Sequence, residues 1–346
     1  MGLNIREIIP RKEIGLSELA NKTVCVDAFN TLYQFLTTIR QPDGTPLMDR
    51  KQRITSHLSG IFYRNIALLE SGIKLIYCFD GRAPLLKMKT WERRGEGRET
   101  AREKYEEAKS SEDLEGMKRY SGQFVRLDSE MIRESKELLE AMGIAVIQAP
   151  GEGEAQAAHI AKIRKDVYAS ASQDYDSLLF ATPRLIRNLT LAKKRKTING
   201  WVEVKPEIIE LEKVLNYLEI NLDQLICLGI LVGTDYNPKG IPGIGQKKAL
   251  QIVRRFKQPI LIFDSVKEQI KNLDEENKFD WREIFELFHK PNVITSLFGF
   301  PKVNEAKIRD ILVKEHDFSD ERVQKQLERL REITESGKQK DLKKWF

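Results

Sequence analysis

Acidic side chains follow three short apolar runs of this chain. Asp27 ends the run KTVCVD, Asp80 ends KLIYCFD, and Asp174 and Asp176 lie at the end of DVYASASQD and just after it. If these runs are parallel strands, their carboxyl ends share the sheet edge where ligands bind in open α/β sheets. Asp174 and Asp176 are two residues apart, so an extended backbone would point both side chains the same way.

Three more acids stand in suggestive contexts. Glu152 and Glu154 lie in PGEGEAQAA, where a glycine-rich loop turns into a helix near Glu154, and Asp235 follows an apolar helix in LVGTDY. Taken singly, each acid is an ordinary turn residue or a carboxylate in the first turn of a helix. Together, clustered carboxylates repel one another unless some are protonated or cations lie among them.

Such a set of oxygen ligands favours Mg²⁺ or Mn²⁺ over zinc. Two ions about 4 Å apart would activate a water on one side of a phosphodiester and stabilise the leaving oxygen on the other. The expected metal ligands are the acids named above: Asp27, Asp80, Glu152, Glu154, Asp174, Asp176 and Asp235.

Histidine and cysteine offer no competing site. The 3 cysteines and 4 histidines have no metal-ligand or disulfide spacing. The cysteines are expected to be buried apolar residues in a reducing compartment, and neither a histidine-based nor a zinc-based active site is expected. The residues are Cys25, Cys78, Cys227, His57, His159, His289 and His316.

The acids need a scaffold, and apolar runs alternate with amphipathic segments of helical length. Residues 56–70 and 129–142 are examples of such helices, and GIAVIQ at 143–148 is a further strand. This alternation predicts the α/β class, with a mostly parallel central sheet and helices on both faces. Residues 81–123 break the pattern, because they are highly charged; they form either an exposed helical insertion or a mobile region.

The second half of the chain is expected to be largely helical. Residues 205–256 predict several helices, and 257–320 a mixture of helices and loops. A helix at 320–335 leads into a polar tail.

The charge balance is compatible with a polyanionic partner. The 58 Lys and Arg exceed the 52 Asp and Glu, giving a formal net charge of +6 and a pI near 9.0. A highly charged soluble surface explains this excess equally well, but basic residues gather in separate segments at 87–118, 193–196 and 239–257. Several basic segments suit a polyanion that touches the protein at several places. No apolar stretch approaches the roughly 20 residues of a membrane span, so we expect a soluble, intracellular protein with no membrane contact.

A glycine-rich turn is the second candidate contact with a phosphate backbone. GIPGIGQKKA, at 240–249, has the pattern of a helix-hairpin-helix module, whose glycines let backbone N–H groups approach phosphate oxygens. Gly243 and Gly245 belong to the turn, and Lys247 and Lys248 add positive charge at the start of the next helix. The alternative is an ordinary turn between two helices.

The chain ends in QKDLKKWF, which places apolar anchors on a polar tail. This pattern predicts a docking peptide that folds on binding. The alternative is a tail that packs on its own domain.

These motifs together resemble the structure-specific 5′ nucleases of the XPG type, and within them the archaeal branch of the flap endonucleases. The resemblance rests on VDAFNTLYQFL, TIRQPDGTPLMD, FYRN, IYCFDGRAP, APGEGEAQAA, ASQDYDSLLF, GTDYNPKGIPGIGQKKAL and the final QKDLKKWF. It covers most of residues 20–256 and the extreme C-terminus. GRAP replaces the usual GKPP after Asp80, and the charged insertion mixes many acids with its bases, which puts the contacts of that insertion in doubt more than the chemistry.

The resemblance implies roles for individual residues. Lys87 and Arg94 would contact the scissile phosphate, and a base near the cut would stack on Tyr33. The positions that would contact DNA are Gly2, Tyr33, Arg40, Arg64, Glu152, Gly233, Asp235, Gly243, Gly245, Lys247 and Lys248. The anchors that would bind the sliding clamp (PCNA) are Gln339, Leu342, Trp345 and Phe346.

The resemblance also implies a domain organisation. The expected division is an N-terminal nuclease region at 1–105 that includes the start of a helical arch, the rest of the arch at 106–125, and an internal nuclease region at 126–258. The hairpin module lies at 225–256, a C-terminal helical region at 259–335 packs on the core, and a flexible clamp-binding tail occupies 336–346.

The implied activity is two-metal hydrolysis at the base of 5′ flaps, with 5′-3′ exonuclease activity, in Okazaki-fragment maturation and long-patch base excision repair. The implied cofactors are two Mg²⁺, with Mn²⁺ able to substitute, and the protein is expected to be a cytoplasmic monomer that binds flap DNA. Three alternatives compete with this interpretation: a bubble-cutting relative, a catalytically silent scaffold at DNA junctions and the clamp, and a small-molecule phosphatase. The complete set of acids argues against the scaffold, and the hairpin and tail argue against the phosphatase.

Overall fold

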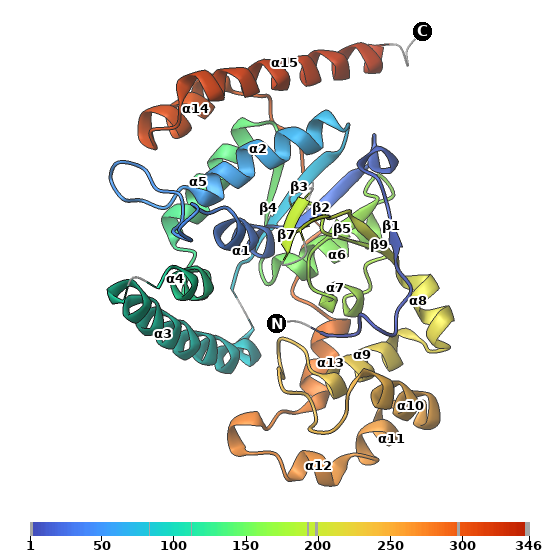
Figure 1. The fold of residues 1–346 in the computed structure, drawn as a ribbon. Helices are drawn as coiled ribbons and strands as arrows, with labels where there is room; N and C mark the ends of the chain where they lie inside the picture. The colour runs from blue at the N-terminus through green and yellow to red at the C-terminus, as the bar shows by residue number, and fades with distance from the viewer. Residues whose placement is uncertain are drawn as a thin grey trace.

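The computed structural model describes residues 3–342, apart from 83, 112, 192–193, 198–199 and 296–297. A seven-stranded sheet lies at its centre, in the order β1-β9-β6-β5-β2-β3-β4 (Figure 1). The strands are β1 (Lys12–Glu13), β2 (Thr23–Asp27), β3 (Lys74–Phe79), β4 (Ala145–Gln148), β5 (Ala169–Ala171), β6 (Arg184–Arg187) and β9 (Glu207–Glu210). The five strands from β6 to β4 are parallel, while β9 and β1 form an antiparallel edge.

The α/β class and the mostly parallel sheet are confirmed, but the sheet is larger than expected. The strand near 166–174 shortens to β5, and β9 lies inside the segment 205–256 for which only helices were expected. A separate antiparallel pair, β7 (Lys194–Thr197) and β8 (Gly200–Glu203), also went unpredicted. These strands are at most four residues long, too short for a hydrophobic period to be recognised.

Helices cover both faces of the sheet (Figure 1), as expected from the alternation of strands and helices along the chain. Val24 and Val26 of β2 pack into one core with α1 (Ala28–Thr38), α2 (Ser56–Glu70) and α5 (Ser129–Ala141). Cys25, between them, faces the opposite core with α6 (Gly153–Ile163). Burial on both sides explains why these strands are apolar throughout.

The α6 side continues into a helical region beyond the sheet, at the lower right of Figure 1. Its helices are α7 (Asp176–Leu179), α8 (Leu211–Leu218), α9 (Leu222–Val232), α10 (Gln246–Phe256), α11 (Pro259–Asp264), α12 (Lys267–Lys271) and α13 (Trp281–His289). Among the described helices, none is long and apolar enough on its own to span a membrane. The pair α8 and α9 passes that test only jointly, across a bend of 81°.

The C-terminal segment packs on the face of the sheet that α1, α2 and α5 cover. It contains α14 (Glu305–Arg309), a π-helical turn (Asp310–Glu315) and α15 (Asp320–Leu342), which runs along α2 at the top of Figure 1. Val323, Leu327 and Leu330 of α15 join the same core as α2. The helix expected to end at residue 335 continues through Leu342.

The charged insertion is helical, the first of the two alternatives. A short 3₁₀ turn (Leu85–Lys87) leads into α3 (Met88–Ser110), and α4 (Leu114–Ser121) packs back against it. Figure 1 shows the two helices standing out at the left of the molecule. The expected division between residues 105 and 106 falls inside α3.

Candidate active site

Two acids reach the site at the ends of adjacent parallel strands. Asp27 is the last residue of β2, and Asp80 directly follows β3. Asp27 also caps α1, because its Oδ1 accepts a hydrogen bond of 3.2 Å from the backbone N–H of Asn30. Ser172 donates to the other carboxylate oxygen of Asp27 at 3.3 Å, linking the end of β5 to the same point.

The start of α6 brings Glu152 and Glu154 to these strand ends. Glu152 is the residue before the helix, and Glu154 lies in its first turn, as expected. The backbone N–H of Gly153 donates to Oδ1 of Asp80 at 2.6 Å, so the helix N-terminus binds this carboxylate directly. Ser177 of α7 donates to Glu154 at 2.5 Å and ties this acid to the following helix.

Asp174 and Asp176 do not lie on an extended backbone, the arrangement under which their side chains would point the same way. The chain turns after β5, and Asp176 is the first residue of α7. Asn30 donates from Nδ2 to Asp174 at 2.9 Å, and the backbone N–H of Leu3 donates to Asp176 at 3.2 Å. The turn and these two hydrogen bonds from residues distant in sequence therefore position the pair. The side-chain alternation of a strand does not.

Lys87 and Asp235 complete the site from two further segments of the chain. Lys87, at the start of the insertion, forms ion pairs with Glu152 and, at 3.4 Å, with Asp235. Asp235 follows α9, as expected, and its neighbour Tyr236 donates a hydrogen bond from its hydroxyl to Glu152. A cation from the insertion thus lies among carboxylates from three parts of the fold.

Burial and crowding shift the ionisation of these acids. Burial, together with the negative charge of neighbouring acids, raises the pKa of Asp27 and of Asp176 to about 8. Burial raises the pKa of Asp80 to about 6, and burial and the charges of Asp27 and Asp176 raise that of Glu154. Burial alone would lower the pKa of Lys87, but attraction by Glu152, Asp235 and Asp80 raises it overall. Without a divalent cation, the raised pKa values favour the protonated forms of these four acids, which limits their repulsion.

The donor set fits hard divalent cations. Every expected ligand is a carboxylate, and four of them have pKa values raised by burial, with further negative charge beside each. Such a group is stabilised by positive charge, which Mg²⁺ or Mn²⁺ supplies and Lys87 supplies only in part.

Several positioning residues were not anticipated from the sequence. Asn30, Ser172, Ser177 and Tyr236 each bind a site carboxylate. All four lie in the quoted motifs, next to or near an acid, but ordinary polar residues in a loop give no signal of their partner.

The hairpin lies between α9 and α10, with Gly245 directly before α10. Gly233, Gly240 and Gly243 have positive φ values of 118°, 53° and 78°, a conformation that side chains rarely adopt. Lys247 and Lys248 are exposed on the first turn of α10. The structure thus has the geometry of two helices joined by a glycine turn.

The other expected DNA contacts lie on α1 and α2. Tyr33 of α1 and Arg64 of α2 are partly exposed. Arg40 follows α1, donates to the Gly44 carbonyl at 2.8 Å, and keeps its Nε and one terminal nitrogen buried without a hydrogen-bond partner among the described residues.

Some expected residues lie outside the part of the chain that is described. Arg94 belongs to α3, and Gln339 and Leu342 to α15, but their side chains are not described. Gly2, Trp345 and Phe346 lie outside the described residues altogether.

Comparison with known proteins shows that two XPG-type family models match the chain. The chain matches the XPG N-terminal domain over residues 4–101 and the XPG I-region over residues 143–235. The catalytic core of Rad2 in complex with DNA substrate, 22% identical with a TM-score of 0.68, shares the fold over 95% of this chain and 100% of that one.

Full-length relatives narrow this class. Flap endonuclease 1 of Thermococcus onnurineus is 52% identical over 100% of this chain and 99% of that protein, and the protein of that name from Sulfolobus acidocaldarius is 48% identical over 99% and 100%. The solved structure of flap endonuclease-1 from Methanococcus jannaschii, 40% identical, covers 97% of this chain and 100% of that chain with a TM-score of 0.76. The chain belongs to the flap endonuclease 1 family, whose members are metal-dependent nucleases.

Proposed function

We propose that this protein is a 5′ flap endonuclease that hydrolyses one phosphodiester at the base of a flap, with 5′-3′ exonuclease activity, in Okazaki-fragment maturation and long-patch repair. The observation that supports it most is the ion pairing of Lys87 with Glu152 and Asp235 inside a buried carboxylate cluster. That cluster lies in a chain 52% identical over its whole length to flap endonuclease 1 of Thermococcus onnurineus. The silent scaffold is not supported.

We propose that the seven acids hold two Mg²⁺, for which Mn²⁺ can substitute. The ions would supply a water activated for attack and stabilisation of the leaving oxygen. The protein's own contribution is to hold the carboxylates in place: the Gly153 N–H orients Asp80, Asn30 orients Asp174, and Ser177 orients Glu154. With the acids already positioned, little reorganisation remains when the substrate arrives.

Lys87 would change partners during the reaction. Its ammonium forms ion pairs with Glu152 and Asp235 in the protein alone, and it would turn to the scissile phosphate when cations bind these acids. Arg94, in the following helix α3, would add a second positive charge. Both residues lie at the base of the arch, which we assign to α3 and α4.

DNA would lie across several surfaces. Lys247, Lys248 and the backbone around Gly243 and Gly245 would bind phosphates of the duplex, while Tyr33 would stack on a base. A cavity of about 490 Å³ lies beside Glu152, and its lining mixes the bases Arg82 and Lys290 with the acids Glu283 and Glu286. Gly2, Arg40, Arg64 and Gly233 remain proposed contacts.

We also propose that the protein acts as a cytoplasmic monomer and that its C-terminal anchors bind the sliding clamp. Since α15 continues through Leu342, the first two anchors, Gln339 and Leu342, would lie on this helix. We also propose the division into an N-terminal nuclease region, an arch, an internal nuclease region, a C-terminal helical region and a clamp-binding tail, with the arch starting within the first of these.

Replacement of Asp176 by Asn tests the metal assignment. The amide keeps the size of the side chain but removes the charge, so flap binding should persist while cutting in Mg²⁺ falls by at least about 100-fold. Cutting at the wild-type rate would contradict the assignment of Asp176.

A further inference from the structure

Two of the four histidines meet in a buried cluster that includes none of the seven acids. His316, which follows the π-helical turn, lies between two carboxylates: its Nδ1 is 3.1 Å from Asp49 and its Nε2 is 3.0 Å from Glu134 of α5. Only 3% of His316 and 4% of Glu134 are exposed to solvent. The wide spacing of the histidines in the sequence gave no indication of this meeting.

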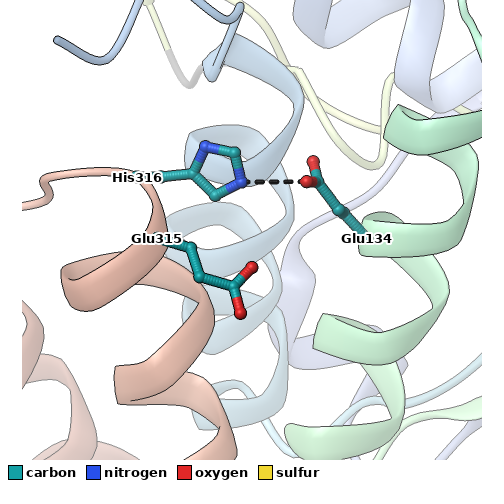
Figure 2. Close-up of side chains that lie close together, drawn as sticks. All are labelled: Glu134, Glu315 and His316. Atoms are coloured by element: carbon teal, nitrogen blue, oxygen red, sulfur yellow. Dashed lines mark hydrogen bonds and ion pairs between the residues drawn. The ribbon is translucent and has the colours of Figure 1, made fainter. Parts of the chain in front are cut away.

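A third ligand group faces the same point. Figure 2 shows Glu315 and His316, from one segment, and Glu134, from the neighbouring helix, converging on each other. One donor atom of each side chain lies within 4.8 Å of the donor atoms of the other two. Glu315 is exposed, so the cluster opens to solvent on that side.

His57 of α2 supplies an independent observation. Its ring is fully buried, and neither ring nitrogen has a hydrogen-bond partner among the described residues. Its Nε2 lies 3.7 Å from the second oxygen of Glu134, too far for a hydrogen bond. Because a neutral imidazole carries one N–H, His57 keeps an unsatisfied buried donor beside Glu134, and a small shift of this carboxylate toward the ring would satisfy it.

We propose that Glu134, Glu315 and His316 form a second metal site, separate from the nuclease site, that takes a single transition-metal ion, with Zn²⁺ as the best fit. Imidazole nitrogen and carboxylate oxygen are both ligand types that zinc accepts, and the imidazole distinguishes this cluster from the all-oxygen set of the nuclease site. Water from the open side would take the fourth position.

The pair His316 and Glu134 needs little adjustment to accept the ion, and the exposed side chain of Glu315 would move toward it from within 4.8 Å. Ligand atoms about 2.0–2.1 Å from a tetrahedral zinc are roughly 3.3 Å apart, so the Nε2 to Glu134 separation of 3.0 Å widens by a few tenths of an ångström. Asp49 accepts from Nδ1 and fixes the tautomer, which leaves Nε2 as the ligand once its proton is displaced. His57 would then donate to the free oxygen of the metal-bound Glu134.

The ion would join distant parts of the chain. Glu134 and His316 are 182 residues apart in sequence, and Asp49 belongs to the loop between α1 and α2. Since the ligands come together only in the folded chain, binding would stabilise the fold.

Zinc uptake by the full-length protein tests the proposal, measured by equilibrium dialysis in millimolar Mg²⁺ so that the nuclease acids are already occupied. We expect one Zn²⁺ per chain and a raised melting temperature. Glu315→Gln should weaken zinc binding by at least about 10-fold, since replacing even an outer partner of a metal ligand costs 10–100-fold. This variant is preferred to changes at Glu134 or His316, because Glu315 is exposed and its loss leaves the buried ion pairs intact.

Two further variants make the result decisive. Glu321→Gln, an exposed acid on α15, should bind zinc as the wild type does, and so should Asp27→Asn combined with Asp176→Asn. No zinc uptake by the wild type, unchanged affinity in Glu315→Gln, or loss of the ion in the double nuclease-site variant would each overturn the proposal.

Discussion

The backbone N–H of Gly153 donates a 2.6 Å hydrogen bond to the carboxylate of Asp80, joining the first turn of α6 to the end of β3. This contact requires the two backbones to approach closely. A Cβ at residue 153 would lie 2.9 Å from Oδ1 of Asp80 and still closer to the carbonyl oxygen of Cys78. Because Glu152 and Glu154 flank this glycine, the same approach positions three of the acids.

Gly153→Ala should therefore damage catalysis by displacing the start of α6. We expect at least a 10-fold loss in the rate of flap cutting and a higher Mg²⁺ requirement, because the altered groups support metal ligands. Gly299→Ala is the matched control, since a Cβ at residue 299 meets nothing within 4 Å. Equal rates for the two variants would show that the approach of α6 to β3 does not matter for the reaction.

Lys87→Met should separate metal binding from catalysis. Removing the ammonium frees Glu152 and Asp235, so Mg²⁺ should bind the DNA-free protein more tightly, as calorimetry would show. Single-turnover cutting should still fall by about 10²–10³-fold, the usual effect of losing one preorganised donor to a developing charge. Lys74→Met, at the exposed start of β3, should change neither quantity. Weaker Mg²⁺ binding by Lys87→Met would contradict the competition between lysine and metal.

The raised pKa values of the buried acids predict a pH dependence of metal-free stability. Asp27 and Asp176, whose ordinary pKa lies near 3.8, titrate near 8 in the fold, so the folded protein holds more protons than the unfolded chain between these values. The free energy of unfolding contributed by these groups then falls as the pH rises through this window. Melting temperatures measured in EDTA should decrease from pH 5 to pH 8, and less steeply in Asp27→Asn.

Magnesium should reverse this trend. Binding displaces the extra protons, so the affinity should rise by about 10-fold per pH unit for each proton released. A metal affinity that is independent of pH across the same window would contradict protonation of the cluster.

Lys247→Ala combined with Lys248→Ala should weaken the binding of duplex-containing DNA. Each lost phosphate contact should reduce the slope of log affinity against log salt by about 0.9. Lys162→Ala with Lys165→Ala removes the same charge from exposed positions at the far end of α6 and should leave the slope unchanged. A steep slope retained in the Lys247 and Lys248 variant would remove the hairpin from the DNA interface.

Truncation after Gly337 should separate clamp binding from cutting. The shortened protein should process free flap substrates at the wild-type rate while losing stimulation by the clamp. Trp345→Ala with Phe346→Ala should have the same effect without shortening the chain. Loss of both activities to the same extent would favour a tail that packs on its own domain.

The sequence predicted the parts of the site that regular periodicity and glycine-rich motifs mark. Asp27 and Asp80 end strands whose apolar runs are evident, and Glu152 and Glu154 stand where a glycine-rich loop enters a helix. Parallel strands deliver their carboxyl ends to one edge, so the meeting of these acids followed from the fold class alone.

Contacts between segments far apart in the sequence could not be predicted from local periodicity or motifs. Asp174 and Asp176 are placed by Asn30 and by the backbone of Leu3, which no local pattern reveals. The antiparallel edge formed by β9 and β1 comes from strands too short to show a period. His57, Glu134 and His316 meet only because the C-terminal segment packs back onto α2 and α5.

Incubation with a double-flap DNA labelled at either end, in Mg²⁺, tests the central claim most directly. A matched blunt duplex and a single strand serve as controls. The proposed function predicts a single cut at the base of the 5′ flap that EDTA abolishes and Asp176→Asn prevents, with little cutting of the controls. Binding of the flap without any cut, in Mg²⁺ or Mn²⁺, would contradict the claim that these carboxylates form a nuclease centre.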